Sequence, residues 1–200
     1  MKRSPLRQNT ANARQTTERR VDNRQLRLLR LGVMGNGDDQ RRLLVVWHSR
    51  TGASEAMARE AARGAGDQIL VDCCAASEAS VERMLSATGF LFVCPENLGG
   101  LSGAMKEMFD RSYYPLLGVR EGYPYGSIIA AGSDGSGAQR QLDRIVSGWR
   151  LKRVVDPLIV NFDAQTPLEI LAYKNVPEET LEDCQNIGQT LAAGIAMGVF

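Results

Sequence analysis

The sequence predicts an α/β domain whose parallel sheet is covered by helices on both faces. From Leu43 onward, short apolar runs alternate with segments of helical periodicity. These runs are apolar throughout, as is typical of strands that are buried on both faces. The chain has 200 residues, of which 44% are hydrophobic and 24% charged, which suffices for one domain with a sizeable core.

The first half of the domain is expected to hold three strands and two helices. The strands are residues 43–48, 68–73 and 89–94, and the helices begin near residues 55 and 81. The first helix has apolar side chains at helical spacing, namely Met57, Ala58, Ala61 and Ala62. The third strand is expected to stop at Pro95, because proline lacks the N–H that a strand donates to its neighbour.

The second half repeats this alternation. Helices are expected over about 104–114, after 137 and from about 177, with strands over 126–131 and 153–160. Two i,i+4 ion pairs, Lys106–Asp110 and Glu107–Arg111, are expected on the solvent side of the first of these helices. Right-handed crossovers leave few topologies for five such strand–helix units.

Charge divides the chain into two regions. Residues 1–42 hold 11 Lys and Arg against 4 Asp and Glu, whereas residues 43–200 hold 13 against 19. The basic extension 1–42 is expected to be disordered, with the folded domain at 43–200. Alternatively, Arg24–Met34 is an amphipathic anchor for an anionic surface, nucleic acid or an import receptor, or translation starts at Met34. The acidic domain argues against nucleic acid as the partner.

Composition also excludes several classes of site. The four cysteines form no C-x-x-C pair and His48 is the only histidine, so no metal site is expected. A hydrolase built on Ser-His-Asp or Cys-His is not expected either. The longest mostly apolar run, Leu191–Phe200, is about half as long as a membrane span, and the N-terminus lacks a secretory signal. A cytoplasmic protein with reduced thiols is therefore expected.

Three loops, at 49–54, 96–103 and 132–137, follow predicted strands and should meet at the carboxyl edge of the sheet, where such folds bind ligands. The first loop, Ser49-Arg50-Thr51-Gly52-Ala53-Ser54, opens a helix, so its N–H groups and the helix dipole favour an anion. It matches neither the Walker A nor the dinucleotide glycine pattern. The alternative interpretation is that Ser49 and Ser54 only cap the helix.

The first loop resembles the phosphate loop of flavodoxins. Residues 45–54, with Ala58 four residues on, are similar to a strand that ends in S/T-x-T-G-x-T and cradles the FMN phosphate. The second loop has Pro95-Glu96-Asn97, then Gly99-Gly100, Lys106 and Asp110. It resembles the flavin loop of NAD(P)H-dependent FMN reductases, which reads P-x-Y-N, small residues, then K-x-x-x-D. The resemblance covers about residues 43–200. This sequence departs from the family pattern in two places: Arg50 puts a cation in a normally neutral loop, and Glu96-Asn97 lacks the tyrosine.

This resemblance implies a flavodoxin-like, doubly wound, five-stranded parallel sheet of order 2-1-3-4-5, with FMN as cofactor and NAD(P)H as co-substrate. In the third loop, glycines allow close approach to a planar ring and polar side chains can bond its edge; the alternative is a flexible turn in which Ser136 caps a helix. The residues expected to bind FMN are Ser49, Arg50, Thr51, Gly52, Ala53, Ser54, Pro95, Glu96, Asn97, Leu98, Gly99, Gly132, Ser133, Asp134 and Gly135.

A reductase is preferred over an electron carrier. Flavodoxins that carry electrons sandwich the ring between aromatic side chains, and loops 96–103 and 132–137 contain none. An uncovered ring leaves room for a nicotinamide, so the expected reaction passes hydride from NAD(P)H to the flavin and on to a quinone, flavin or similar small acceptor. No catalytic side chain is required, because the flavin carries the chemistry. Backbone N–H groups around 97–99 are expected to stabilise the reduced ring.

The resemblance also bears on partners. A homodimer is expected, because active sites of the family commonly lie near a subunit interface. Tyr113 and Tyr114 either pack before Pro115 or, with Tyr123 or Tyr125, reach a neighbouring subunit's flavin. Two other functions stay open: a flavodoxin-type electron carrier, and a non-redox module that binds a phosphorylated metabolite.

Overall fold

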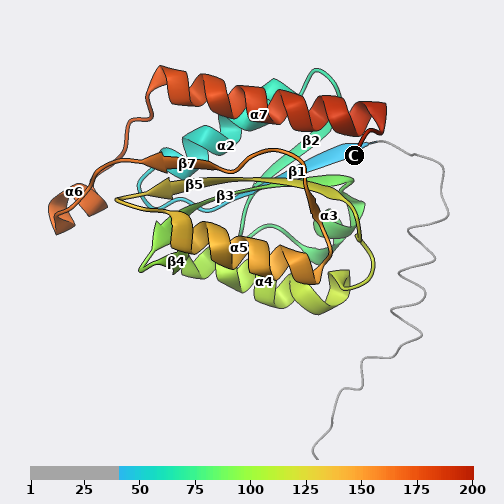
Figure 1. The fold of residues 1–200 in the computed structure, drawn as a ribbon, viewed down its shortest axis with the longest axis horizontal. Coiled ribbons are helices and arrows are strands. Elements are labelled where there is room, and N and C mark those ends of the chain that lie inside the picture. The colour runs from blue at the N-terminus through green and yellow to red at the C-terminus, as the bar shows by residue number, and fades with distance from the viewer. Residues whose placement is uncertain (1–40) are drawn as a thin grey trace, which may run out of the picture.

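The computed structural model describes residues 41–200, which form a sheet between two layers of helices (Figure 1). The basic extension of the sequence therefore lies outside the described residues, except for its last two positions. Arg42 already belongs to the first strand, which therefore begins one residue earlier than expected. The strands are β1 Arg42–Trp47, β2 Leu70–Ala75, β3 Gly89–Asn97, β4 Gly100–Leu101, β5 Pro124–Ala131, β6 Lys152–Arg153 and β7 Leu158–Asn161. The helices are α2 Ala53–Ala65, α3 Val81–Ser86, α4 Gly103–Leu116, α5 Ser136–Gly148, α6 Pro167–Leu171 and α7 Glu178–Met197.

The sheet has the predicted order. Its path is β2-β1-β3-β5-β6, all parallel, and β7 pairs with the later part of β5. The expected fifth strand is thus present as two short segments beside β5, with the N–H-lacking Pro157 in the gap between them. A two-residue strand, β4, adds one antiparallel pairing to the end of β3. The flavodoxin-like α/β prediction is confirmed, with a larger number of strand segments.

Pro95 does not end the third strand, which continues to Asn97. Pro95 pairs in register with Ala130 of β5. The side of β3 on which the proline lacks an N–H faces β1, whose last paired residue is Trp47 opposite Val93. The strand therefore continues because its pairing with β1 is already ending at that point.

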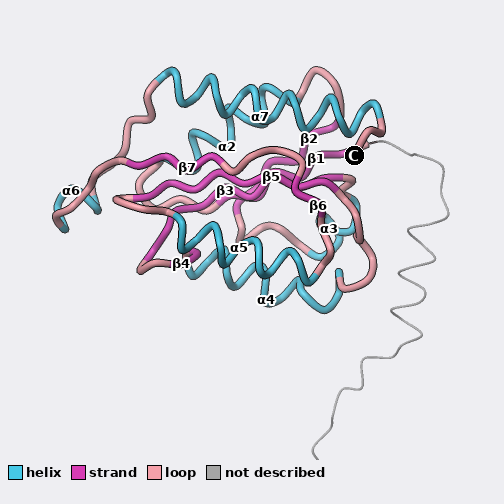
Figure 2. The backbone as a smooth tube through the Cα atoms, viewed as in Figure 1, coloured by secondary structure: helices cyan, strands magenta, loops and turns pink. Residues whose placement is uncertain are grey.

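Each face of the sheet is covered by its own helices. Helices α2 and α7 lie on one face, and α3, α4 and α5 on the other (Figure 2). Between α2 and α7 the backbones approach so closely that a Cβ at Gly188 would lie 1.8 Å from the carbonyl oxygen of Ala61. On the opposite face Phe92, Phe109 and Trp149 form a chain of tilted rings 5.0 and 5.5 Å apart.

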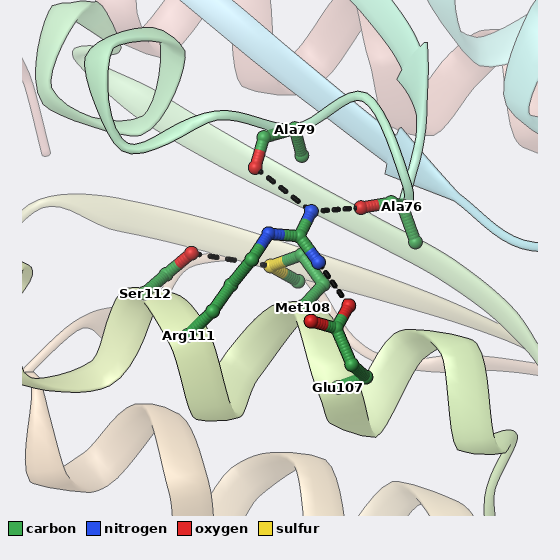
Figure 3. A network of polar contacts seen from close by, with 6 residues as sticks. All are labelled: Ala76, Ala79, Glu107, Met108, Arg111 and Ser112. Carbon is green, nitrogen blue, oxygen red and sulfur yellow. Dashed lines mark hydrogen bonds and ion pairs between the residues drawn. The ribbon is translucent and has the colours of Figure 1, made fainter.

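One predicted surface ion pair has a structural role. Arg111 of α4 pairs with Glu107 as expected, but its guanidinium also donates to the carbonyl oxygens of Ala76 and Ala79 (Figure 3). Ala76 and Ala79 are buried and lie in the turn that joins β2 to α3. Arg111 thereby ties this turn to α4. The second predicted pair, Lys106–Asp110, is present on the exposed surface.

The two ends of the described chain meet at the amino edge of the sheet. The guanidinium of Arg41, just before β1, donates to the carbonyl oxygens of Ile195 and Ala196 near the end of α7. A cation at a helix C-terminus is also favoured by the helix dipole. In residues 41–200, no helix is both long and apolar enough to traverse a lipid bilayer.

Candidate functional site

The three predicted loops meet around one cavity at the carboxyl edge of the sheet. The cavity has a volume of about 210 Å³. The first loop contributes Arg50, Thr51 and Ala53 to its walls, and the second contributes Pro95, Glu96 and Asn97. The third contributes Gly132, together with Ala130 and Ala131 at the end of β5. The topology of the parallel sheet thus brings together residues from distant parts of the sequence.

The first loop leaves the N-terminus of α2 open. The N-cap residue is Gly52 (φ 91°), which makes no side-chain capping hydrogen bond. The hydroxyl of Ser49 accepts a hydrogen bond from the N–H of Gly52 at 3.0 Å, which fixes the turn. Ser54 lies inside the first turn and is 1% exposed, so the interpretation of Ser54 as the helix cap is wrong. The first-turn N–H groups of α2 have no side-chain cap, as an anion-binding helix terminus requires.

Glu96 joins the second loop to the third. Its carboxylate accepts hydrogen bonds from the N–H of Gly135 at 2.8 Å and from the N–H of Ala138 at 3.1 Å. Gly135 (φ 83°) is the N-cap of α5. The side chain that caps this helix is therefore Glu96, from another loop, and not Ser136 as in the alternative interpretation of the sequence. The hydroxyl of Ser136 instead donates to Asp134 at 2.5 Å and lowers the pKa of that carboxyl.

Not every predicted residue lines the cavity. Ser49, Gly52 and Ser54 lie beside its wall and shape the first loop. Leu98, Gly99, Ser133, Asp134 and Gly135 lie outside it. Leu98 has a left-handed backbone (φ 53°) and a fully exposed side chain at the tip of the second loop.

Sequence reasoning missed one wall of the cavity. We call residues 165–176 the strap; it contains α6 and follows β7. Its contribution to the wall, together with that of the residues just before it, consists of Phe162, Ala164, Ile170, Leu171 and Lys174. In Figure 1 α6 lies beyond the carboxyl ends of the strands. The sequence did carry a signal, since Thr166-Pro167-Leu168-Glu169 has the pattern of a capping box with proline at the first helical position.

The strap is attached directly to the first loop. The N–H of Lys174 donates to the carbonyl oxygen of Thr51 at 2.8 Å. The ring of Tyr173 packs against Gly52 so closely that a Cβ there would lie 2.3 Å from the ring. Gly52 is thus required twice, by its left-handed backbone and by the tyrosine above it.

Two ionisable side chains near the cavity, His48 and Cys94, have pKa shifts that favour their neutral forms. Burial, and secondarily the charge of Arg50, lower the pKa of His48, whose Nδ1 lies 2.9 Å from the hydroxyl of Ser102. Burial raises the pKa of the Cys94 thiol to about 12, so it is not a thiolate nucleophile at neutral pH. No group of three or more His, Cys, Asp or Glu side chains that could hold a metal ion occurs among the described residues.

Comparison with known proteins identifies the family. The family model for NADPH-dependent FMN reductase matches residues 51–165, which is more than half of the chain. The chain belongs to this family. The predicted resemblance to NAD(P)H-dependent FMN reductases is therefore confirmed.

The proteins similar to this FMN reductase family member include flavodoxins. A flavodoxin from Aquifex aeolicus is 28% identical over 167 residues, covering 79% of this chain and 89% of that protein. The structure of a flavodoxin from the domain Archaea matches with a TM-score of 0.63 at 13% identity, covering 77% and 98% of the two chains. A flavodoxin, WrbA-like protein from Agrobacterium tumefaciens matches with a TM-score of 0.60 at 19% identity, covering 78% and 98%. These two structural similarities show the fold.

The family match includes most of the loop residues that form the site. The matched segment spans Thr51–Ser54 and all of the second and third loops, and it ends where the strap begins. In this member of the family, the strap supplies the remaining wall.

Proposed function

We propose that this chain binds FMN in the cavity and acts as an NAD(P)H-dependent oxidoreductase, passing hydride on to a quinone, a flavin or a similar small acceptor. The open N-terminus of α2 carries the proposal. There, Gly52 lets the loop turn without a side-chain cap, beside a cavity at the carboxyl ends of β1, β3 and β5. Such a terminus favours a phosphate through its N–H groups and the helix dipole.

The residues present fit the parts of FMN. The first-turn N–H groups of α2 and the hydroxyl of Thr51 suit the phosphate, with Arg50 beside them. The hydroxyls of Ser49 and Ser54, which lie beside the cavity wall, are proposed to donate to the phosphate as well. Pro95, Asn97 and Gly132 line the cavity where the second and third loops face each other, which suits a planar ring. Leu98, Gly99, Ser133, Asp134 and Gly135 complete the two loops and are proposed to contact the edge of the ring.

When bound, FMN would supply the hydride-accepting and hydride-donating ring. The chain's own residues would hold and orient it. Glu96 keeps the second and third loops in one arrangement through its two backbone hydrogen bonds, so the ring site does not have to be ordered on binding. Backbone N–H groups of residues 97–99 are proposed to stabilise negative charge on the bound ring.

The absence of aromatic residues in loops 96–103 and 132–137 favours a reductase over an electron carrier. In the described structure the cavity wall has one aromatic residue, Phe162, and the opposite loops present small and polar groups. A nicotinamide could therefore stack on the ring from the side of those loops.

We further propose that the protein works as a homodimer. Large apolar side chains are exposed at the end of the molecule that holds the cavity, namely Leu98, Leu168, Ile170, Leu171 and Tyr173. A second copy would cover this patch. Light scattering at micromolar concentration should give twice the chain mass, and a monomer would contradict this part of the proposal.

A ligand titration tests the proposed function. FMN and riboflavin are titrated into the wild type and Ser49→Ala, with binding followed by quenching of flavin fluorescence. A hydrogen bond to a charged acceptor contributes roughly 1.5–3 kcal/mol, so Ser49→Ala should weaken FMN binding about 10- to 100-fold. Riboflavin lacks the phosphate, so its affinity should barely change. Equal losses for both ligands, or no binding of either to the wild type, would overturn the FMN assignment.

Activity separates the remaining candidates. The FMN-loaded protein should oxidise NADPH in the presence of a quinone. Flavin binding without NADPH oxidation would favour the electron carrier. Binding of a phosphorylated metabolite by a protein with no visible absorption would favour the non-redox module.

A further inference from the structure

The cavity has an excess of positive charge. Arg50 and Lys174 both line it, and the structure shows no carboxylate of residues 41–200 within ion-pair distance of either. Glu96 is the one acidic residue in the described wall, and its oxygens already accept the N–H groups of Gly135 and Ala138. Two cations that line one cavity, and that form no ion pair within the described residues, favour an anionic ligand.

Lys174 is held at the cavity by the strap. Its backbone N–H donates to Thr51 in the first loop. Its ammonium donates to the carbonyl oxygens of Glu169 and, at 2.9 Å, of Ala172, where it caps the C-terminal end of α6. An ammonium has three N–H donors, so one is left for a ligand.

Glu169, the acidic residue of the strap, forms no ion pair with this ammonium. The pKa of Glu169 is lowered first by the backbone N–H groups of Thr166 and Gln165 and only last by the charge of Lys174. The carboxylate of Glu169 accepts the N–H groups of Gln165 at 3.0 Å and Thr166 at 2.9 Å. These bonds place it at the N-terminal end of α6, whereas Lys174 caps the C-terminal end. The residue through which the strap is bonded to the first loop, Lys174, is therefore also the one that carries the positive charge.

We propose that Lys174 is a binding residue for the ligand's phosphate and acts from the strap together with Arg50. The inference rests on the proposed function and adds a second element to the phosphate site. A dianionic phosphate at the N-terminus of α2 is contacted by the ammonium of Lys174, so the phosphate also holds the strap against the first loop. The site then selects a phosphate monoester over the same molecule without phosphate.

The test compares FMN with riboflavin in charge variants of one position. Lys174→Gln removes the charge but keeps an amide that can donate to the α6 carbonyls, and Lys174→Arg keeps the charge. Lys152→Gln, an exposed lysine in β6 at the other end of the sheet, is the matched control. At about 50 mM salt, Lys174→Gln should weaken FMN binding about tenfold. Riboflavin affinity should be unchanged, and Lys174→Arg and Lys152→Gln should bind both ligands like the wild type.

The salt dependence of FMN affinity distinguishes a lysine that binds the phosphate from one that only supports the strap. Raising the salt to about 500 mM should shrink the difference between wild type and Lys174→Gln, because screening weakens the ion pair. Equal weakening of FMN and riboflavin in Lys174→Gln would show that the lysine only supports the strap, and would overturn the inference. If the wild type prefers FMN and Lys174→Gln keeps that preference, the inference fails and the proposed function stands. If the wild type binds neither FMN nor riboflavin, both the inference and the proposed function fail.

A second measurement needs no variant. Hydrogen exchange of the strap amides is compared in inorganic phosphate and in chloride at matched ionic strength. Phosphate should slow exchange at the N–H of Lys174, which is bonded to Thr51. Identical exchange in the two salts would contradict the proposal.

Discussion

The carboxylate of Glu96 lies 2.8 Å from the backbone nitrogen of Gly135, a residue of another loop 39 positions later in the sequence. This bond and the one to Ala138 make the second and third loops a single unit. A Cβ at Gly137 would lie 2.2 Å from the carbonyl oxygen of Gly99, so the two backbones are also in direct contact. The shape of the cavity therefore depends on a side chain whose position in the sequence gives no hint of this partner.

Glu96→Gln should destabilise the protein by about 1–3 kcal/mol, because the charge at the N-terminus of α5 is lost and one acceptor becomes a donor. Both FMN and riboflavin should bind more weakly, since the ring site is disturbed rather than the phosphate site. Urea unfolding and flavin titration measure the two effects. Asp67→Asn, an exposed acid in a turn, is the control and should leave both unchanged.

Gly52→Ala should destabilise the protein by about 1–3 kcal/mol and weaken FMN binding. The alanine would have to adopt the positive φ of this position, which disfavours a side chain. Its methyl would also lie 2.3 Å from the ring of Tyr173. Combining it with Tyr173→Ala should restore the steric part of the loss and leave the backbone part, about 1 kcal/mol. Gly103→Ala, where a Cβ meets nothing within 4 Å, is the control in thermal unfolding. If the losses in stability of Gly52→Ala and Tyr173→Ala simply add in the double variant, Tyr173 does not pack on Gly52.

Ser54→Ala should leave the free energy of unfolding within about 0.5 kcal/mol of the wild type, because Gly52 and not Ser54 is the N-cap of α2. If its hydroxyl donates to the phosphate, FMN affinity should fall about tenfold. Thermal unfolding and FMN titration on the same sample decide. A stability loss of about 1 kcal/mol with intact affinity would restore the capping interpretation.

Arg111→Ala should destabilise the protein by about 1–3 kcal/mol, because the carbonyls of the buried residues Ala76 and Ala79 lose their donor. Asp110→Ala on the same helix breaks only the exposed pair with Lys106 and should cost less than about 0.5 kcal/mol. Denaturant unfolding of both variants makes the comparison. Similar small losses would mean that Arg111 acts only through Glu107.

Because His48 is the single histidine of the sequence, its titration can be followed without overlap from another imidazole. Because the pKa of His48 is lowered in the folded state, the unfolded chain binds its proton more readily. The stability that neutral His48 contributes to the folded state is present when the pH is above 6.5, its ordinary pKa. This stability is lost as the pH falls through the lower pKa of the folded state. NMR titration should find a folded pKa below 6.5, and Arg50→Gln should raise it part of the way back. Since burial is the larger cause, a full return to the ordinary value would contradict the structure.

The sequence was sufficient for the fold and for the loops, because each rests on local patterns. Continuous apolar strands and helices of regular period are visible residue by residue, and parallel topology carries their ends to one edge. The first loop could be assigned because strand, turn and helix terminus follow one another within ten residues.

The position of the strap at the cavity and the bridge made by Glu96 could not be predicted from the sequence, for different reasons. Helix α6 has five residues and none is buried, so it has no apolar periodicity to detect. Its contact with Thr51 joins residues that are far apart in the chain. In the family resemblance, Glu96-Asn97 stands out only by lacking the tyrosine, which gives no sign that Glu96 accepts two N–H groups of a distant loop. Long-range pairings of this kind depend on the three-dimensional path of the chain.

The contact of Arg41 with the end of α7 has a consequence for engineering. It places the beginning and the end of the described chain side by side at the edge of the sheet opposite α6 (Figure 1). A short linker could therefore join residue 200 to residue 41, and new termini could be opened in the exposed turn near Asp67. A circular permutant of this design, or a fluorescent protein fused at the original end, would leave the ligand edge free.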